Sequence, residues 1–158
     1  EGAPVVVVDL GTATNIEVID RAGSFLGGII APGMNTGVQA LAQFAARLPQ
    51  VDLTLPRHVV GTNTDDVIRS GIIYGEVARI DGLVRMIFDE LGYEAPVIAT
   101  GGLSETISTL CATVTRREPY LTHYGLRLIF ERTARTADAA ESAGADRGIA
   151  RDTERTAS

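Results

Sequence analysis

Runs of apolar residues at the start of the chain predict three consecutive strands. Residues 5–8 are four valines in a row, which is typical of a strand buried on both faces. Ile16, Val18 and Ile19 mark a second strand. Residues 24–31 form a third, which Gly27 and Gly28 interrupt, and this indicates a bulge or a group that approaches the backbone closely. Because tight turns join the segments, the pattern predicts an antiparallel meander.

Two helices are predicted after the strands. Residues 35–47 carry apolar side chains at steps of three and four, which gives the helix one apolar face. A longer helical pattern runs to Leu91, with Asn63 or Thr64 as its N-cap and Gly92 as its C-terminal cap. Three glycines inside this pattern predict close packing against another helix or a ligand, with a break near the first: Gly71, Gly75 and Gly82.

The remainder of the chain predicts a strand, a short helix, an edge strand and a final helix. These elements are expected at residues 96–99, 103–110, 112–115 and 119–132, in that order. The final helix has four apolar residues expected on its inner side: Leu121, Leu126, Ile129 and Phe130. Residues 133–158 hold Ile149 as their only large apolar side chain, so we expect a disordered tail that cannot offset the entropy of ordering.

The composition indicates a folded, acidic domain. Hydrophobic residues make up 45% of the 158 residues, and this fraction is high enough for a packed core. The formal net charge of -6 argues against a nucleic-acid-binding protein, which needs a basic face to neutralise phosphates. Cys111 is the only cysteine, which excludes an intrachain disulfide and fits a reducing cytoplasm. No stretch is long and apolar enough to span a bilayer, so we expect a cytoplasmic protein with no membrane partner.

A carboxylate, a glycine and two hydroxyl groups meet where the first predicted strand turns into the second. Asp9 ends the first strand, and Gly11 allows the backbone to turn and to approach a ligand. Thr12 and Thr14 supply the hydroxyl groups. Such a junction can hold a phosphate and its counter-cation. The same residues also suit a simple hairpin in which the Asp and Thr side chains satisfy the turn.

The hexapeptide Asp9-Leu10-Gly11-Thr12-Ala13-Thr14 resembles the D-x-G-T-A-T signature of type III pantothenate kinases, which belong to the actin, sugar-kinase and Hsp70-like ATPase superfamily. Further segments follow in the family's order and at about its spacing. They are Gly27-Gly28-Ile29-Ile30-Ala31-Pro32-Gly33, Leu48-Pro49, Gly61-Thr62-Asn63-Thr64, Ser70-Gly71, Thr100-Gly101-Gly102-Leu103, and Leu121-Thr122 with Gly125-Leu126. The resemblance covers residues 4–132 and corresponds to the second half of such a kinase.

The resemblance implies an α/β fold, namely a ribonuclease-H-like half of an actin/sugar-kinase ATPase with a mixed sheet, an antiparallel meander and flanking helices. Residues 1–132 would be the second, C-terminal domain of the kinase, and residues 133–158 its disordered tail; the N-terminal domain would be absent. The implied activity is ATP-dependent phosphorylation of pantothenate to 4'-phosphopantothenate, the first step of coenzyme A synthesis.

The resemblance also assigns roles to single residues. The position of Asp9 holds a monovalent cation, either potassium or ammonium, in these kinases. The position of Thr12 contacts ATP, which binds with magnesium, and Gly11 lets the main chain approach the phosphate. Thr64 matches the threonine that contacts pantothenate, and helix capping is its alternative role. ATP and pantothenate are the implied small-molecule partners, and the implied assembly is a homodimer.

Two other residue pairs are open to a functional and a structural interpretation. Gly101 and Gly102 match a superfamily turn that lies near the nucleoside, and an ordinary tight turn fits them equally well. His58 and His123 have no cysteine or histidine partner at metal-ligand spacing. We therefore expect both histidines to be structural or solvated.

The sequence departs from the family pattern in one important respect. In these kinases a first phosphate loop, D-x-G-N-T, and a G-x-D-R motif precede D-x-G-T, and the Asp of G-x-D-R accepts the pantothenate hydroxyl proton. Here Gly144-Ala145-Asp146-Arg147 lies in the tail, which indicates a chance match. No catalytic residue is assigned, and we expect the chain alone to be inactive or nearly so. Asn15 and Glu17 also replace a Thr and an Asp of the signature, which alters side-chain reach at the turn.

Other functions compatible with these residues stay open. A non-catalytic regulator, such as a transcriptional accessory factor, could keep the fold without the base, and so could a decayed remnant of a kinase. A sugar- or acetate-kinase relative would lack the correspondence at residues 61–64.

Overall fold

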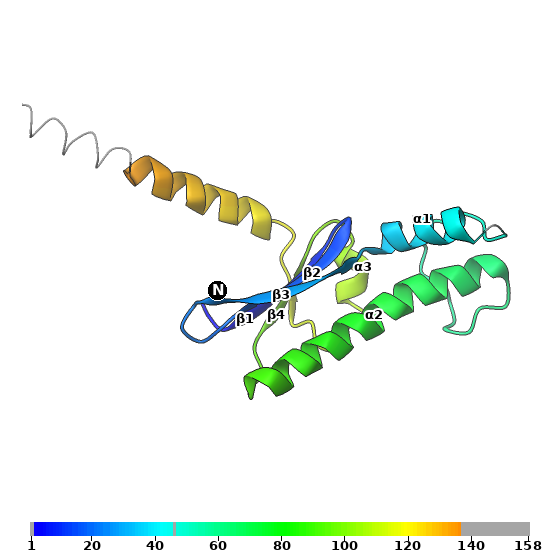
Figure 1. The fold of residues 1–158 in the computed structure, drawn as a ribbon, viewed down its shortest axis with the longest axis horizontal. Helices are drawn as coiled ribbons and strands as arrows, with labels where there is room; N and C mark the ends of the chain where they lie inside the picture. Colours follow the sequence, from blue (N-terminus) through cyan, green and yellow to red (C-terminus); the bar gives the residue numbers. More distant parts are fainter. Residues whose placement is uncertain (1, 46, 137–158) are drawn as a thin grey trace, which may run out of the picture. The chain divides into compact units, whose positions relative to one another are not determined.

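The computed structural model describes residues 2–45 and 47–136, and Figure 1 shows their elements. The chain divides into two compact units, Glu1–Pro119 and Tyr120–Ser158. The first unit contains a mixed five-stranded sheet in the order β3-β2-β1-β4-β5, flanked by helices. The predicted α/β fold with a mixed sheet is thus confirmed.

Three strands form the predicted antiparallel meander: β1 (Val5–Leu10), β2 (Ala13–Ile19) and β3 (Phe25–Pro32). In β1, Val6 and Val8 are fully buried, whereas Val5 and Val7 are only partly buried. The prediction that this strand is buried on both faces is therefore wrong. The physical reason is that Val6 and Val8 share a core with α2, on one side of the sheet only.

Two further strands extend the sheet: β4 (Val97–Thr100), parallel to β1, and β5 (Arg116–Arg117), parallel to β4. The sequence places the edge strand at residues 112–115, which is wrong in position. Ala112 and Thr113 donate their backbone N–H groups to the carboxylate of Asp81. These groups are therefore not available for a strand ladder, and the strand begins farther along the chain.

Two main helices, α1 (Met34–Phe44) and α2 (Thr64–Leu91), lie side by side, and α2 runs along the sheet (Figure 1). Asn63 caps α2 by accepting a hydrogen bond from the N–H of Asp66, and Gly92 ends it with a φ of 72°. The helix is continuous, so the break expected near Gly71 does not occur. A Cβ at Gly71, Gly75 or Gly82 would meet nothing within 4 Å, so the close packing predicted at these glycines is also wrong.

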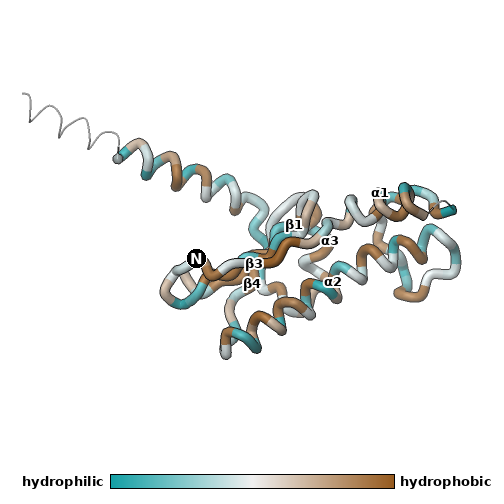
Figure 2. Tube along the Cα trace, viewed as in Figure 1, coloured by the Kyte–Doolittle hydropathy of each residue, from teal (hydrophilic) through white to brown (hydrophobic). Residues whose placement is uncertain are grey.

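The core of the first unit lies between the sheet and α2. Ile73, Ile80 and Val84 of α2 pack in one cluster with Val6 and Val8 of β1. The short helix α3 (Ser104–Ser108) adds Ile107 to the same cluster. Figure 2 shows hydrophobic positions recurring along α2 with hydrophilic positions between them, as a helix with one apolar side requires.

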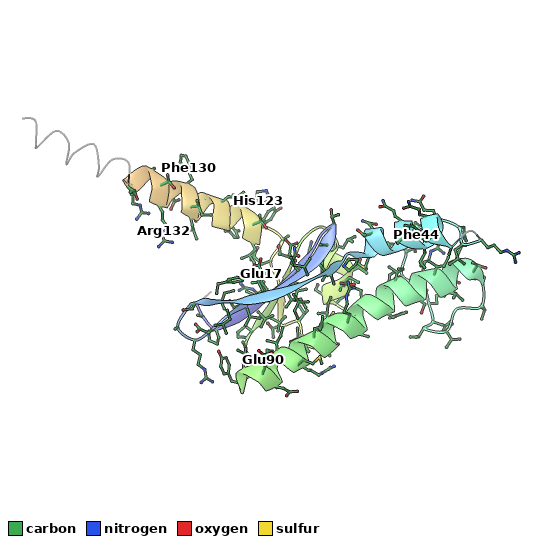
Figure 3. All side chains as sticks on the ribbon, viewed as in Figure 1. Glu17, Phe44, Glu90, His123, Phe130 and Arg132 are labelled. Carbon is green, nitrogen blue, oxygen red and sulfur yellow. The ribbon has the colours of Figure 1, made fainter. Side chains whose placement is uncertain are left out.

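In the second unit, residues 121–136 form a helix. Figure 3 labels Phe130 on this helix. The expectation that Leu126, Ile129 and Phe130 lie on its inner side stays a prediction. The helix also continues through the first four residues of the predicted tail; residues 137–158, including the G-x-D-R sequence at 144–147, lie outside the described residues.

Within residues 2–45 and 47–136, no helix carries an apolar stretch of the length that crossing a membrane requires.

Candidate functional site

The carboxyl ends of β1 and β4 meet at one edge of the sheet, and Asp9 lies there. The two strands are parallel neighbours, and Asp9 pairs in register with Thr100. The Asp9 side chain is half-buried and has no hydrogen bond or ion pair with any described residue. Ligands commonly bind beyond the carboxyl ends of parallel strands. Asp9 therefore offers an unpartnered negative charge at a position suited to a ligand.

Gly101 forms the wall beside this carboxylate. It follows β4 and adopts a φ of 89°, in the left-handed region. A Cβ at this position would lie 2.4 Å from Oδ1 of Asp9 and 2.7 Å from both the backbone N and O of Leu10. The turn is held by Ser104, whose hydroxyl donates to the carbonyl of Gly101 at 2.6 Å. Only a residue without a side chain can pack this closely against Asp9 and Leu10.

The Thr12 turn is fixed through its backbone, and its side chain stays free. The carbonyl of Thr12 accepts hydrogen bonds from the N–H of Gly33 at 3.1 Å and from the hydroxyl of Thr36 at 2.8 Å. Thr12 is exposed, and its hydroxyl has no partner among the described residues. The N–H of Gly11, in contrast, donates to the carbonyl of Ala13 at 3.0 Å. The free donor of this turn is therefore the Thr12 hydroxyl rather than the Gly11 amide.

The structure separates the two threonines of the signature. Thr14 is 2% exposed, and its hydroxyl donates to Oε1 of Glu76 at 2.6 Å. Thr14 therefore faces the interior while Thr12 faces solvent. Sequence reasoning missed Glu76 and its partner Arg79. One signal could have revealed Glu76, because it lies on the apolar side of α2 between Ile73 and Ile80.

Thr64 lies well away from this turn. It is the first residue of α2 and is exposed. Arg79, which contacts Thr14, is 15 residues farther along the same helix, and at 1.5 Å per residue the separation along the axis is about 22 Å. Thr64 therefore lies at the opposite end of this stretch of α2 from the contact that Arg79 makes with Thr14.

A polar pocket of about 280 Å³ lies near the start of α2. Its lining includes Thr54, Arg57, His58, Asp66 and Arg69, and it does not include Thr64. Beside it, the Thr54 hydroxyl and the Arg69 guanidinium hold the pKa of Asp52 below its usual value. Because Arg69 also pairs with Asp65 and Asp66, its charge is already neutralised.

The histidines form no metal site in the described part of the chain. His58 is exposed in the polar pocket, and His123 packs edge-on against Tyr120 with ring centroids 6.1 Å apart. Among residues 2–45 and 47–136, no three His, Cys, Asp or Glu side chains gather in a way that could hold a metal ion. A cation beside Asp9 would therefore need main-chain or ligand oxygens to complete its coordination.

Comparison with known proteins decides the family. A family model described as Type III pantothenate kinase matches residues 1–86. The chain belongs to the type III pantothenate kinase family. Type III pantothenate kinases of Frankia alni and of a Parafrankia species are 49% and 50% identical to it over 131 residues. Each match covers 83% of this chain and 52% of the relative, so the chain spans about half the length of the curated relatives it matches.

A solved structure supports the fold assignment. The chain is similar to a crystal structure from Campylobacter jejuni that is described as a Baf family transcriptional activator, with a TM-score of 0.58 and 20% identity. The match covers 84% of this chain and 59% of that one. At this identity the likeness shows the fold alone.

The residues at the turn are compatible with the ligands that the type III pantothenate kinase family implies. A hard cation prefers oxygen ligands, and Asp9 provides an unpartnered carboxylate next to the main chain of Leu10 and Gly101. An ATP phosphate accepts hydrogen bonds, and the Thr12 hydroxyl is free to donate one.

Proposed function

We propose that this chain supplies the cation- and nucleotide-binding part of a pantothenate kinase, with residues 1–132 as its second domain. The reaction is the phosphorylation of pantothenate to 4'-phosphopantothenate by ATP, the first step of coenzyme A synthesis. One observation carries the proposal, namely that Asp9 has no hydrogen-bond or ion-pair partner among the described residues. Leaving a half-buried carboxylate unpaired costs free energy, and a cation bound to the folded state would offset that cost.

Each residue of the turn has a separate task in this proposal. Asp9 holds a potassium or ammonium ion, and Thr12 donates a hydrogen bond to a phosphate oxygen of magnesium-bound ATP. The bound cations would offset the repulsion between the phosphate oxygens. Gly101 lets the chain after β4 pack directly against Asp9, and Gly11 lets the backbone turn tightly between the strands.

Thr64 is proposed to contact pantothenate, and its position favours the homodimer that the family resemblance implies. Thr64 begins α2, about 22 Å along the helix axis from Arg79, which contacts Thr14. A homodimer in which Thr64 of one copy reaches the turn of the other would bring both substrates together. The helix-capping role is taken by Asn63, which leaves the Thr64 side chain available.

We expect nucleotide binding without substantial turnover from these 158 residues. No side chain near the turn is assigned as the base that accepts the pantothenate hydroxyl proton, and loss of a base costs about 100-fold or more in rate. A coupled ADP-release assay with ATP, potassium and pantothenate measures this directly. Turnover equal to that of a Frankia alni relative would show that the chain holds a base of its own.

The proposed function is tested by the potassium dependence of nucleotide binding. The fluorescent analogue MANT-ATP, with magnesium, is titrated into the protein in potassium chloride and then in tetramethylammonium chloride. We expect tighter binding in potassium, and in Asp9→Asn we expect about tenfold weaker binding that no longer depends on the cation. Glu17→Gln is the matched control, because Glu17 is an exposed carboxylate on the neighbouring strand β2 (Figure 3). If the parent protein binds no nucleotide, the kinase proposal fails and the regulator becomes the better account.

A further inference from the structure

A buried acidic residue on α2 has no role in the proposed chemistry. The Glu76 side chain is 3% exposed, and it lies between the core residues Ile73 and Ile80. A buried carboxylate is stable only when its oxygens are paired. Both carboxylate oxygens of Glu76 are paired. Oε1 accepts a hydrogen bond from the Thr14 hydroxyl at 2.6 Å, and Oε2 accepts one from the guanidinium of Arg79.

Arg79 extends the same network to the sheet. Its Nη2 donates to the carbonyl of Pro32 at 2.8 Å and approaches the Thr14 hydroxyl at 3.4 Å. Its Nε is buried without a hydrogen-bond partner among the described residues. The guanidinium thus joins α2 to the last residue of β3 and to β2, although this placement leaves one of its donors unsatisfied.

Both contacts of this charged pair lie directly next to the candidate site. Thr14 is the residue that pairs with Leu10 and closes the hairpin on which Asp9 and Thr12 lie. Pro32 precedes Gly33, whose N–H donates to the carbonyl of Thr12 at 3.1 Å. Gly33 also packs so closely that a Cβ there would lie 2.5 Å from that carbonyl oxygen. A shift of Thr14 or of Pro32 would therefore move the Thr12 turn.

We propose that Glu76 and Arg79 are positioning residues for the Asp9–Thr12 turn. Glu76 fixes the hydroxyl of Thr14 inward, so that Thr12 alone presents a hydroxyl to the nucleotide phosphate. Arg79 fixes Pro32, and through Gly33 it sets the direction of the Thr12 peptide. This inference rests on the proposed function only where nucleotide affinity is measured; the geometry of the turn can be tested without a ligand.

A stabilising role by itself does not account for this pair. Well-packed apolar residues of similar size often replace a buried ion pair with no loss of stability. The unsatisfied Nε of Arg79 adds a further cost. The charges of Glu76 and Arg79 are better explained by orientation of the turn. Hydrogen bonds fix the direction of the groups that they join, whereas apolar contacts do not.

The test separates positioning from stability. The double variant Glu76→Leu/Arg79→Met removes the charges and keeps the volume. We expect it to unfold within a few degrees of the parent protein. Hydrogen exchange at the amides of Gly11 and Gly33, which are both hydrogen-bonded in the turn, should become about tenfold faster. We also expect MANT-ATP to bind about tenfold more weakly in potassium. Thr14→Val removes the hydroxyl alone. If the double variant does not fold, the exchange rates of the turn amides in Thr14→Val show whether the network positions the turn.

The control and the contrary outcome are equally defined. Arg69→Met breaks an exposed ion-pair cluster near the start of the same helix, and it should leave both amides and the nucleotide affinity unchanged. The inference is overturned if the amides of Gly11 and Gly33 keep the exchange rates of the parent protein in the double variant or, where that does not fold, in Thr14→Val. If the parent protein binds no MANT-ATP, the proposed function fails, but the amide exchange still decides whether Glu76 and Arg79 position the turn.

Discussion

The backbone of Gly101 lies so close to Asp9 that a Cβ on the glycine would stand 2.4 Å from Oδ1 of the carboxylate. The two residues come from different strands, since Asp9 lies near the end of β1 and Gly101 follows β4. Parallel pairing of these strands brings them together. The carboxylate and the glycine turn therefore form one structural unit, although they are far apart in the sequence.

Replacing Gly101 should damage both the fold and the site. Gly101→Ala places a side chain at a φ of 89° and against the backbone of Leu10, and we expect a loss of about 1–3 kcal/mol in the free energy of unfolding. Displacement of Asp9 should also abolish the potassium dependence of MANT-ATP binding. Urea unfolding and nucleotide titration measure the two effects. Gly102→Ala is the matched control, because a Cβ there would meet nothing within 4 Å; equal effects of the two variants would refute this account.

Local sequence signals predicted those elements whose determinants are local. The meander follows from short apolar segments with turn residues between them. The limits of α2 follow from Asn63 at its start and Gly92 at its end, which satisfy the free backbone groups of a helix. Asp9 and Thr12 were also predicted as site residues, because a short motif spans both. That assignment stays a prediction until binding is measured.

Features that depend on distant partners could not be predicted in the same way. The burial of Glu76 requires Thr14 and Arg79 to meet it, and no local pattern specifies that meeting. The position of β5 depends on Asp81, which takes the N–H groups of residues 112 and 113 away from the sheet. In the helix at 121–136 the apolar period is present, but the period alone does not specify what would cover it.

Asn63 and Thr64 separate a structural role from a binding role. Asn63 accepts the N–H of Asp66 at 2.9 Å, so Asn63→Ala should lower the free energy of unfolding by about 1 kcal/mol. The Thr64 hydroxyl has no partner among the described residues, so Thr64→Ala should leave stability nearly unchanged. If Thr64 contacts pantothenate, the same variant weakens pantothenate binding in a calorimetric titration. Destabilisation by Thr64→Ala as large as that by Asn63→Ala would mean that the hydroxyl has a capping role.

Asp81 should make the stability of the protein depend on pH in the acid range. Burial alone would raise its pKa, but hydrogen bonds from the N–H of Ala112 and from the hydroxyl and N–H of Thr113 outweigh burial, and the pKa is lowered. A carboxyl group with a lowered folded-state pKa stabilises the fold above its unfolded pKa of about 3.9. This contribution is lost as the pH falls through the folded-state value.

Asp81→Asn tests this dependence. At pH 7 we expect a loss of about 1.5–3 kcal/mol in the free energy of unfolding, since hydrogen bonds to a charged acceptor are removed. The difference from the parent protein should shrink below about pH 4, where the parent also loses the charge. Urea unfolding at a series of pH values measures the difference. Asp89→Asn, an exposed change on the same helix, should give no such profile, and a pH-independent loss in Asp81→Asn would contradict the assignment.

Cys111 should be unreactive in the folded protein. The thiol is buried, and burial raises its pKa to about 12, with further contributions from the negative charges of Asp81 and Glu76. Because the thiolate is the reactive form, Ellman's reagent at pH 8 should label Cys111 at least about 100-fold more slowly in the folded protein than in urea. The variant T106C/C111S places a thiol at an exposed position of α3 and should react quickly without urea. Fast labelling of Cys111 in the folded protein would show that the segment after α3 opens readily. That result would contradict the burial that raises the pKa of the thiol.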